Sequence, residues 1–128
     1  MKSLEKNIYT YLKERGWHGL RPGDLAKSIS IESGELLELF QWENPTLAEV
    51  KKDKEKLAAV KKELADVLLY CLDMSILLGF DTKKILKEKL EHTKKKYPAH
   101  LMKKRNGKEP GTEDMYWKIK KEYRQKGL

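Results

Sequence analysis

Two acidic motifs are the clearest candidates for chemistry in this sequence. Glu32 and Glu35 form one pair spaced three residues apart, and Glu63 and Asp66 form a second pair with the same spacing. Because three residues make nearly one helical turn, each pair projects from one face of a helix. Four converging carboxylates would bind a hard cation, Mg²⁺ in the first place and Mn²⁺ as a substitute. None of the three histidines lies three or four residues from these acids, which argues against zinc and against a ferritin-like di-iron centre.

The surroundings of both pairs favour a binding site over a solvated surface. At 100° per residue, the first pair shares an arc of about 80° with Ser28 and Trp42, directly beside the apolar arc of its helix. The second pair shares a similar arc with Tyr70 and Asp73. Mg²⁺ held by few carboxylates commonly takes phosphate oxygens from a substrate, and aromatic side chains can stack on a nucleotide base. The pattern therefore suggests a phosphoanhydride or a phosphoester as substrate.

The rest of the sequence predicts an all-α protein. With 128 residues, the chain is expected to form one domain with a modest core. Thr46 followed by Glu49 is a capping-box pattern and predicts the start of a short helix. Cys71 lies in an apolar stripe and is expected to be a buried structural thiol. Apolar residues at helical spacing, ended by glycine, proline or capping residues, predict the main helices over about 2–16, 24–42, 56–78, 82–96 and 112–125.

The net charge of +8 comes entirely from the end of the chain. Residues 1–93 carry 16 Lys and Arg against 16 Asp and Glu, whereas residues 94–128 carry 12 against 4. This basic tail could be a phosphate-binding arm, a contact with an acidic subunit face or a solvated segment. A nucleic-acid-binding helical module without catalysis is the alternative function, although nucleic acid is not the expected partner. The apolar runs are too short to span a membrane and no secretory segment follows Met1, so the expected location is the cytoplasm.

Three segments in one colinear order carry a family resemblance. They are Glu32-x-x-Glu35-x-x-Glu38-Leu39-Phe40-Gln41-Trp42, then Glu63-Leu64-Ala65-Asp66-Val67-Leu68-x-Tyr70, then Lys89-x-x-x-x-x-x-Lys96-Tyr97-Pro98. Together they closely resemble the MazG-like all-α nucleoside triphosphate pyrophosphohydrolases, especially the short single-domain branch that includes dCTP pyrophosphatase. The resemblance implies a four-helix-bundle-like MazG-type fold, assembled as a homodimer or as a tetramer of two dimers. It also implies Mg²⁺-dependent hydrolysis of a (deoxy)nucleoside triphosphate to the monophosphate and pyrophosphate.

The same resemblance assigns roles to individual residues. It implies that the metal is bound by Glu32, Glu35, Glu63 and Asp66. The substrate-binding candidates are Trp17, Lys27, Trp42, Tyr70, Lys89, Thr93, Lys96 and Tyr97.

Two positions differ from the family pattern, and they affect the expected chemistry. Thr93 stands where related enzymes commonly have Asn, which affects a hydrogen bond to the nucleotide. Ile31 stands where many members have Glu, so the general base is Glu35 or Glu38, or the metal serves alone. The expected domain covers residues 1–100.

Beyond this domain, residues 101–128 are expected to form a basic, helical C-terminal extension. We expect it to dock on the same domain or on a neighbouring subunit. Arg105 in this segment is a further candidate for neutralising phosphate charge.

Overall fold

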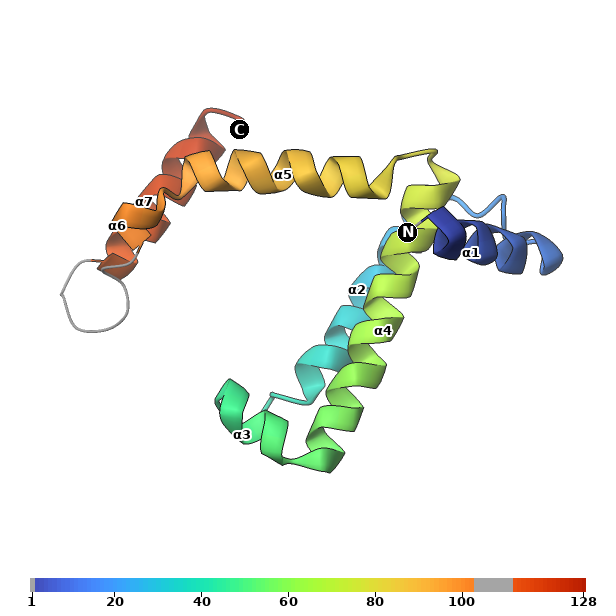
Figure 1. Ribbon diagram of the computed structural model, residues 1–128, viewed down its shortest axis with the longest axis horizontal. Coiled ribbons are helices and arrows are strands. Elements are labelled where there is room, and N and C mark those ends of the chain that lie inside the picture. Colours follow the sequence, from blue (N-terminus) through green and yellow to red (C-terminus); the bar gives the residue numbers. More distant parts are fainter. Residues whose placement is uncertain (1, 103–111) are drawn as a thin grey trace. The chain divides into compact units, whose positions relative to one another are not determined.

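The structure is a computed structural model that describes residues 2–102 and 112–128. This part of the chain forms helices α1 to α7 joined by turns and loops, without a strand (Figure 1). It divides into two compact units, Met1–Thr82 and Lys83–Leu128, and each is described by itself. The all-α class predicted from the sequence is confirmed.

The first unit is built on two helices that run antiparallel to each other, α2 (Pro22–Glu38) and α4 (Lys54–Leu77) (Figure 1). The short helix α3 (Leu47–Lys52) lies in the connection between them. Because the two long helices are antiparallel, residues near the middle of α2 lie beside residues near the middle of α4. Residues near the start of α2 lie beside the last turns of α4.

Capping side chains determine where the connection turns back. The Thr46 hydroxyl accepts a hydrogen bond from the Glu49 amide at 3.2 Å, as the capping-box pattern predicted. Asp53 accepts one from the Lys56 amide at 3.0 Å and so caps the start of α4. The Lys56 ammonium donates a hydrogen bond to the Leu39 carbonyl, which joins the start of α4 to the end of α2.

Helix α1 (Lys2–Glu14) packs against α4 in the first unit. Gly16 ends this segment with a φ of +69°, a left-handed conformation that glycine adopts without steric cost. The Trp17 amide then donates a hydrogen bond to the Leu12 carbonyl at 2.8 Å, so the chain folds back over the end of the helix. The described residues bury three apolar side chains almost completely: Ile8, Leu12 and Leu25.

Helix α2 ends earlier than its sequence pattern suggested. The pattern extended to about Trp42, but the last helical residue is Glu38. The chain continues in a tighter turn, in which the Phe40 amide donates to the Leu37 carbonyl at 2.9 Å. Pro45 restricts the residue before it to extended conformations, so the chain leaves the helix before it reaches the proline. Trp42 therefore lies outside the helix and is 87% exposed, and its predicted place on the acidic helical arc was wrong.

The second unit contains most of α5 (Thr82–Lys96), the short helix α6 (Ala99–Met102) and α7 (Thr112–Gln125). Helices over 82–96 and 112–125 were predicted, whereas α6 was not. The ring of Tyr97, which follows α5, stacks on that of Tyr116 in α7 with centroids 4.9 Å apart. This stack joins the segment after α5 to α7.

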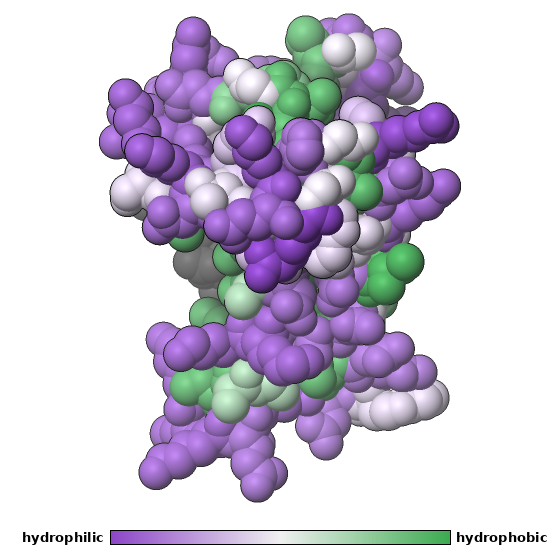
Figure 2. All heavy atoms as spheres, turned by 90° about the vertical axis from the view of Figure 1, so that its right-hand side faces the viewer, coloured by the Kyte–Doolittle hydropathy of each residue, from purple (hydrophilic) through white to green (hydrophobic). Residues whose placement is uncertain are grey.

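Much apolar surface stays exposed in the described chain, and Figure 2 shows apolar side chains at the surface between polar ones. Leu64 and Leu68 of α4 are 43% and 53% exposed. Cys71 continues this stripe and is exposed too, so the expectation of a buried thiol was wrong. The helices of the first unit leave this face of α4 uncovered. None of the described helices is both long and apolar enough to cross a membrane.

Candidate active site

Three carboxylates meet where α2 and α4 lie side by side. Glu32 belongs to α2, whereas Glu63 and Asp66 belong to α4, and one oxygen atom of each lies within 4.8 Å of the other two. All three residues are half-buried. The two acids of α4 are one helical turn apart, and the antiparallel packing puts Glu32 next to them. The fold thus brings together three of the four acids that the sequence predicted as metal ligands.

Glu35 borders this acidic cluster of Glu32, Glu63 and Asp66. It lies one turn after Glu32, is exposed, and lines the same pocket. Hydrogen bonding between the two side chains is the largest effect that raises the pKa of Glu32 above its usual range, and burial comes next. The negative charges of Glu35, Asp66 and Glu63 raise this pKa further. Without a cation, the four acids therefore repel one another, and a proton is retained more readily than in water.

Two buried oxygen atoms of the acidic cluster have no hydrogen-bond partner among the described residues, Oε2 of Glu32 and Oε2 of Glu63. Oε1 of Glu63 accepts a hydrogen bond from the Lys62 ammonium at 3.2 Å, and this contact raises the pKa of Lys62. Buried carboxylate oxygens without a donor are unfavourable unless positive charge is nearby. An all-oxygen donor set of this kind suits Mg²⁺ or Mn²⁺. The residues present therefore fit a hard divalent cation.

The acidic cluster lies at one end of a pocket of about 460 Å³, a volume typical of small-molecule sites. At this acidic end the pocket is lined by Glu32, Glu35 and Asp66. Because α2 and α4 are antiparallel, the start of α2 and the last turns of α4 form the opposite end, near α1 (Figure 1). Apolar and aromatic side chains make up most of this aromatic end, which Asp24 and Asp73 also line: Tyr11, Leu12, Trp17, Leu20, Leu25 and Leu69.

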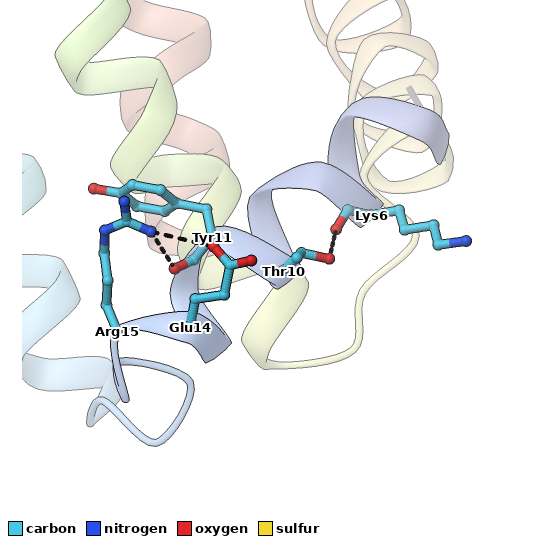
Figure 3. Close-up of polar contacts among 5 residues, drawn as sticks. All are labelled: Lys6, Thr10, Tyr11, Glu14 and Arg15. Atoms are coloured by element: carbon cyan, nitrogen blue, oxygen red, sulfur yellow. Dashed lines mark hydrogen bonds and ion pairs between the residues drawn. The ribbon is translucent and has the colours of Figure 1, made fainter.

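An edge-to-face pair of rings lines the aromatic end of the pocket. The centroids of Tyr11 and Trp17 are 5.9 Å apart and their planes meet at 71°. The Arg15 guanidinium lies 4.1 Å from the Tyr11 ring centroid and donates a hydrogen bond to the Tyr11 carbonyl at 3.1 Å (Figure 3). Glu14 forms an ion pair with Arg15 at 3.6 Å. These contacts hold Tyr11 in place beside Trp17, which remains 45% exposed and can stack on a ligand.

Asp73 also lines the pocket, and its sequence context predicted no role for it. It is only 5% exposed, and its Oδ1 atom is buried without a hydrogen-bond partner among the described residues. Burial raises the pKa of this carboxyl group. The only sequence feature that could have indicated a place for Asp73 in the pocket is the helical arc that it shares with Asp66 and Tyr70. Nothing in the sequence distinguished it from an ordinary acid on that arc.

The predicted substrate-binding residues of the first unit separate into two groups. Trp17 and Tyr70 line the pocket. Lys27 and Trp42 are not among its lining residues, and Lys27 is exposed and pairs with the acid three residues before it at 3.8 Å. Glu38, a predicted catalytic residue, is exposed at the last position of α2 and does not line the pocket either. The roles proposed for these residues from the sequence stay predictions.

Four further predicted residues belong to the second unit. Lys89 is exposed, whereas Thr93, Lys96 and Tyr97 are half-buried. The Lys96 ammonium lies 5.3 Å from the centroid of the Tyr97 ring, a cation–π contact. Their contribution to a nucleotide site stays a prediction. Arg105, the additional basic candidate, lies outside the described residues.

Several known proteins have sequences similar to most of this chain. The mouse (Mus musculus) protein dCTP pyrophosphatase 1 is 33% identical over 94 residues, which cover 71% of this chain and 55% of that protein. The human (Homo sapiens) protein of the same name is 32% identical over 101 residues, with the same shares covered. The chain therefore spans about half the length of the curated relatives that it matches.

A solved structure and a family model agree with these sequence matches. The crystal structure of a pyrophosphatase from Archaeoglobus fulgidus superposes with a TM-score of 0.66 at 36% sequence identity, covering 77% of this chain and 92% of that one. The model of the MazG-like family matches residues 27–109, a segment that contains all four acids of the two motifs. This match covers more than half of the chain. The chain therefore belongs to the MazG-like family.

Proposed function

We propose that this protein hydrolyses (deoxy)nucleoside triphosphates to the monophosphate and pyrophosphate, with Mg²⁺ as the cofactor. The observation that carries the proposal is one pocket with clustered acids at one end and mostly apolar and aromatic side chains at the other. Phosphates and a base need these two environments, and the pocket offers them side by side. The names of the similar proteins, dCTP pyrophosphatase 1 and a pyrophosphatase, support this reaction class. Such an activity would cleanse or control the nucleotide pool.

The acidic end would bind the metal. Glu32, Glu63 and Asp66 are the proposed ligands because their oxygens converge, and two of those oxygens are buried without a partner. Glu35 is the proposed fourth acid, either as a ligand or as the base. When bound, Mg²⁺ would offset the charge of the phosphates and lower the pKa of a water molecule. Mn²⁺, which accepts the same oxygen ligands, is expected to substitute.

The proposed reaction is attack by water on the α-phosphorus. The water oxygen forms a bond to this phosphorus, the bond to the oxygen that bridges to the β-phosphorus breaks, and pyrophosphate leaves. Glu35 is the proposed acceptor of the water proton because it is exposed at the acidic end of the pocket, within reach of solvent. Glu38 is the second candidate, although it lies outside the lining of the pocket.

The aromatic end would bind the base. Trp17 offers an exposed ring face, and Tyr70 lies on α4 one turn after Asp66. Stacking on such a ring contributes about 1–3 kcal/mol per base. Lys89, Thr93, Lys96 and Tyr97 of the second unit stay proposed substrate-binding residues on the family resemblance alone.

A second copy of this chain is the proposed partner, in a homodimer or a dimer of dimers. A groove lined by Ser33, Leu36, Leu37, Phe40, Val60 and Leu64 runs along α2 and α4. Leu37 is 68% exposed in this groove and Leu64 is 43% exposed, so apolar side chains from both helices meet at the surface there. Association between identical chains would cover this apolar surface.

The function is tested by incubating the full chain with each canonical dNTP and NTP in the presence of Mg²⁺. We expect release of pyrophosphate, not of orthophosphate, together with one equivalent of the monophosphate. If intact, folded protein releases no pyrophosphate from any triphosphate, the proposal is wrong. The nucleic-acid-binding alternative is tested in parallel, because it requires binding to DNA or RNA that weakens steeply with salt and needs no Mg²⁺.

A further inference from the structure

Asp73 is a buried carboxyl group that the proposed hydrolysis does not use. It lies on the same face of α4 as Asp66, seven residues later, which corresponds to a rise of about 10.5 Å along the helix. That separation is comparable to the span of a nucleoside from its 5′ phosphate to the pairing edge of its base. A nucleotide with its phosphates at the acidic cluster would therefore bring the base edge to the level of Asp73.

The surroundings of Asp73 leave its Oδ1 atom without a partner. The residue is 5% exposed and lines the pocket at its aromatic end. No Lys, Arg or His is among the residues that line this pocket in the described part of the chain. A buried polar atom without a hydrogen bond is unfavourable, so a ligand that supplies a partner for Oδ1 would remove this cost. The missing contact is a donor, because a carboxylate oxygen accepts hydrogen bonds.

We propose that Asp73 selects the base of the substrate by accepting a hydrogen bond from an exocyclic amino group on its pairing edge. This proposal rests on the proposed function, since it assumes that the pocket binds a nucleotide. Bases with an amino group at this place, such as cytosine and adenine, supply the donor. Uracil, thymine and hypoxanthine have a carbonyl oxygen there instead. Two acceptor oxygens would then face each other in a buried site, and binding would be disfavoured.

Two matched substrate pairs test this proposal, because the members of each differ by one exchange of an amino group for an oxygen. dCTP is compared with dUTP, and dATP with deoxyinosine triphosphate, so that the test does not depend on whether the pocket takes a pyrimidine or a purine. In whichever pair the pocket accepts, pyrimidine or purine, we expect kcat/KM to be about 5- to 150-fold higher for the substrate with the amino group. This is the range expected of a good hydrogen-bonded contact to a base. Equal rates, or a preference for the oxygen member, overturn the proposal.

Substitution of Asp73 identifies the residue responsible. In Asp73→Asn the side-chain amide can either accept a hydrogen bond from an amino group or donate one to a carbonyl. The ratio of kcat/KM between paired substrates is therefore expected to shrink to within about twofold of unity. The main cause should be faster hydrolysis of the substrate that carries the carbonyl oxygen. In Asp73→Leu the acceptor is lost, and kcat/KM is expected to fall for the amino member only. Glu55→Gln is the matched control, because it removes an exposed acid from the first turn of the same helix.

The ratio between paired substrates separates base reading from a structural role. A variant that only disturbs the fold slows both members equally and leaves the ratio unchanged, and an unchanged ratio in folded Asp73→Asn overturns the proposal. Binding of the uncleaved α,β-imido analogues of the same four substrates is measured by quenching of tryptophan fluorescence. If these analogues bind with the amino preference but no triphosphate is hydrolysed, the proposed function fails while base reading by Asp73 stands. If triphosphates are hydrolysed without the preference, base reading fails alone.

Discussion

A carboxylate oxygen of Glu32 lies within 4.8 Å of one from Asp66, although the two residues come from different helices. The charge of Asp66 is one of the effects that raise the pKa of Glu32. Two like charges this close oppose the packing of α2 against α4, and a divalent cation between them would reverse that repulsion. Metal binding and helix packing are therefore linked through the same pair of carboxylates, so loss of the metal should weaken the contact between α2 and α4.

The first expected outcome concerns a metal ligand. Asp66→Asn keeps the size of the side chain but removes a negative charge from the acidic cluster. We expect Mg²⁺ affinity to fall by at least about tenfold and turnover by about 100-fold or more, because even residues behind the direct ligands commonly contribute such factors. Isothermal titration with Mg²⁺ and a pyrophosphate-release assay measure the two effects. Glu55→Gln is the control, and full activity in Asp66→Asn would remove this residue from the metal site.

Removal of the metal is expected to lower thermal stability. A ligand present at 100 times its Kd stabilises the folded state by about 2.7 kcal/mol, which corresponds to a Tm increase on the order of 10 °C for a chain of this size. Calorimetry in Mg²⁺ and in a chelator measures the difference. The increase should be much smaller in Asp66→Asn. An identical Tm in both buffers for the unsubstituted protein contradicts a cation site between α2 and α4.

The pH dependence of stability should reveal the buried carboxyl of Asp73. Burial raises its pKa in the folded state above the ordinary value of 3.8, so the folded state retains the proton more strongly than the unfolded chain. The contribution of this group to stability is therefore fully present below pH 3.8 and is lost as the pH rises through the folded pKa. Urea unfolding at several pH values compares the protein with Asp73→Asn. The free energy of unfolding should fall with rising pH more steeply in the unsubstituted protein, and parallel curves would contradict this.

Trp17 is expected to contribute through stacking on the base. Trp17→Ala should raise KM by about 5- to 150-fold, corresponding to the loss of one stacked ring, with a smaller effect on kcat. Arg15→Gln removes the cation that lies over Tyr11 and should give a weaker effect in the same direction. Steady-state kinetics with the preferred triphosphate measure both variants. Trp117→Ala is the control, because Trp117 is an exposed tryptophan of the second unit. An unchanged KM in Trp17→Ala would exclude stacking of Trp17 on the base.

Self-association is expected to depend on the apolar groove beside α2. Leu37→Lys puts a charge on a leucine that is 68% exposed and lines this groove. We expect the mass measured by light scattering to fall toward that of one chain, because burying an unpaired charge in an interface is strongly unfavourable. Leu86→Lys is the matched control, since Leu86 is 62% exposed but is not part of the groove. An unchanged mass in Leu37→Lys places the interface elsewhere.

The helices and the acidic cluster could be predicted from sequence because both depend on local spacing. Glycine, proline and capping residues determined where α1, α4 and α5 begin or end, and carboxylates one turn apart remain one turn apart in any helix. The meeting of Glu32 with Glu63 and Asp66 requires two helices to pack. The sequence indicated that meeting only through the apolar arcs beside the acids and through the family resemblance.

The remaining features depend on how far elements extend and on what covers them. The periodic pattern around Trp42 continued past the point where the backbone leaves the helix, so periodicity alone put this ring on the wrong element. The burial of Asp73 and the exposure of Cys71 are decided by which face of α4 is covered, and no local pattern contains that information. Local sequence patterns therefore predicted most of the helices, but they did not predict what surrounds individual side chains.

The lack of basic side chains along the pocket in the described part of the chain has a consequence for the order of events during turnover. A free triphosphate carries several negative charges, and in the metal-free protein it would meet Glu32, Glu35 and Asp66 without a basic side chain among the lining residues of the pocket. It would be repelled at the entrance, and more strongly at low ionic strength. If the proposed function is right, we expect the magnesium–nucleotide complex to be the species that enters the metal-free protein. The rate at fixed nucleotide should follow the concentration of that complex, and an excess of uncomplexed nucleotide should inhibit by withdrawing the cation rather than by occupying the pocket.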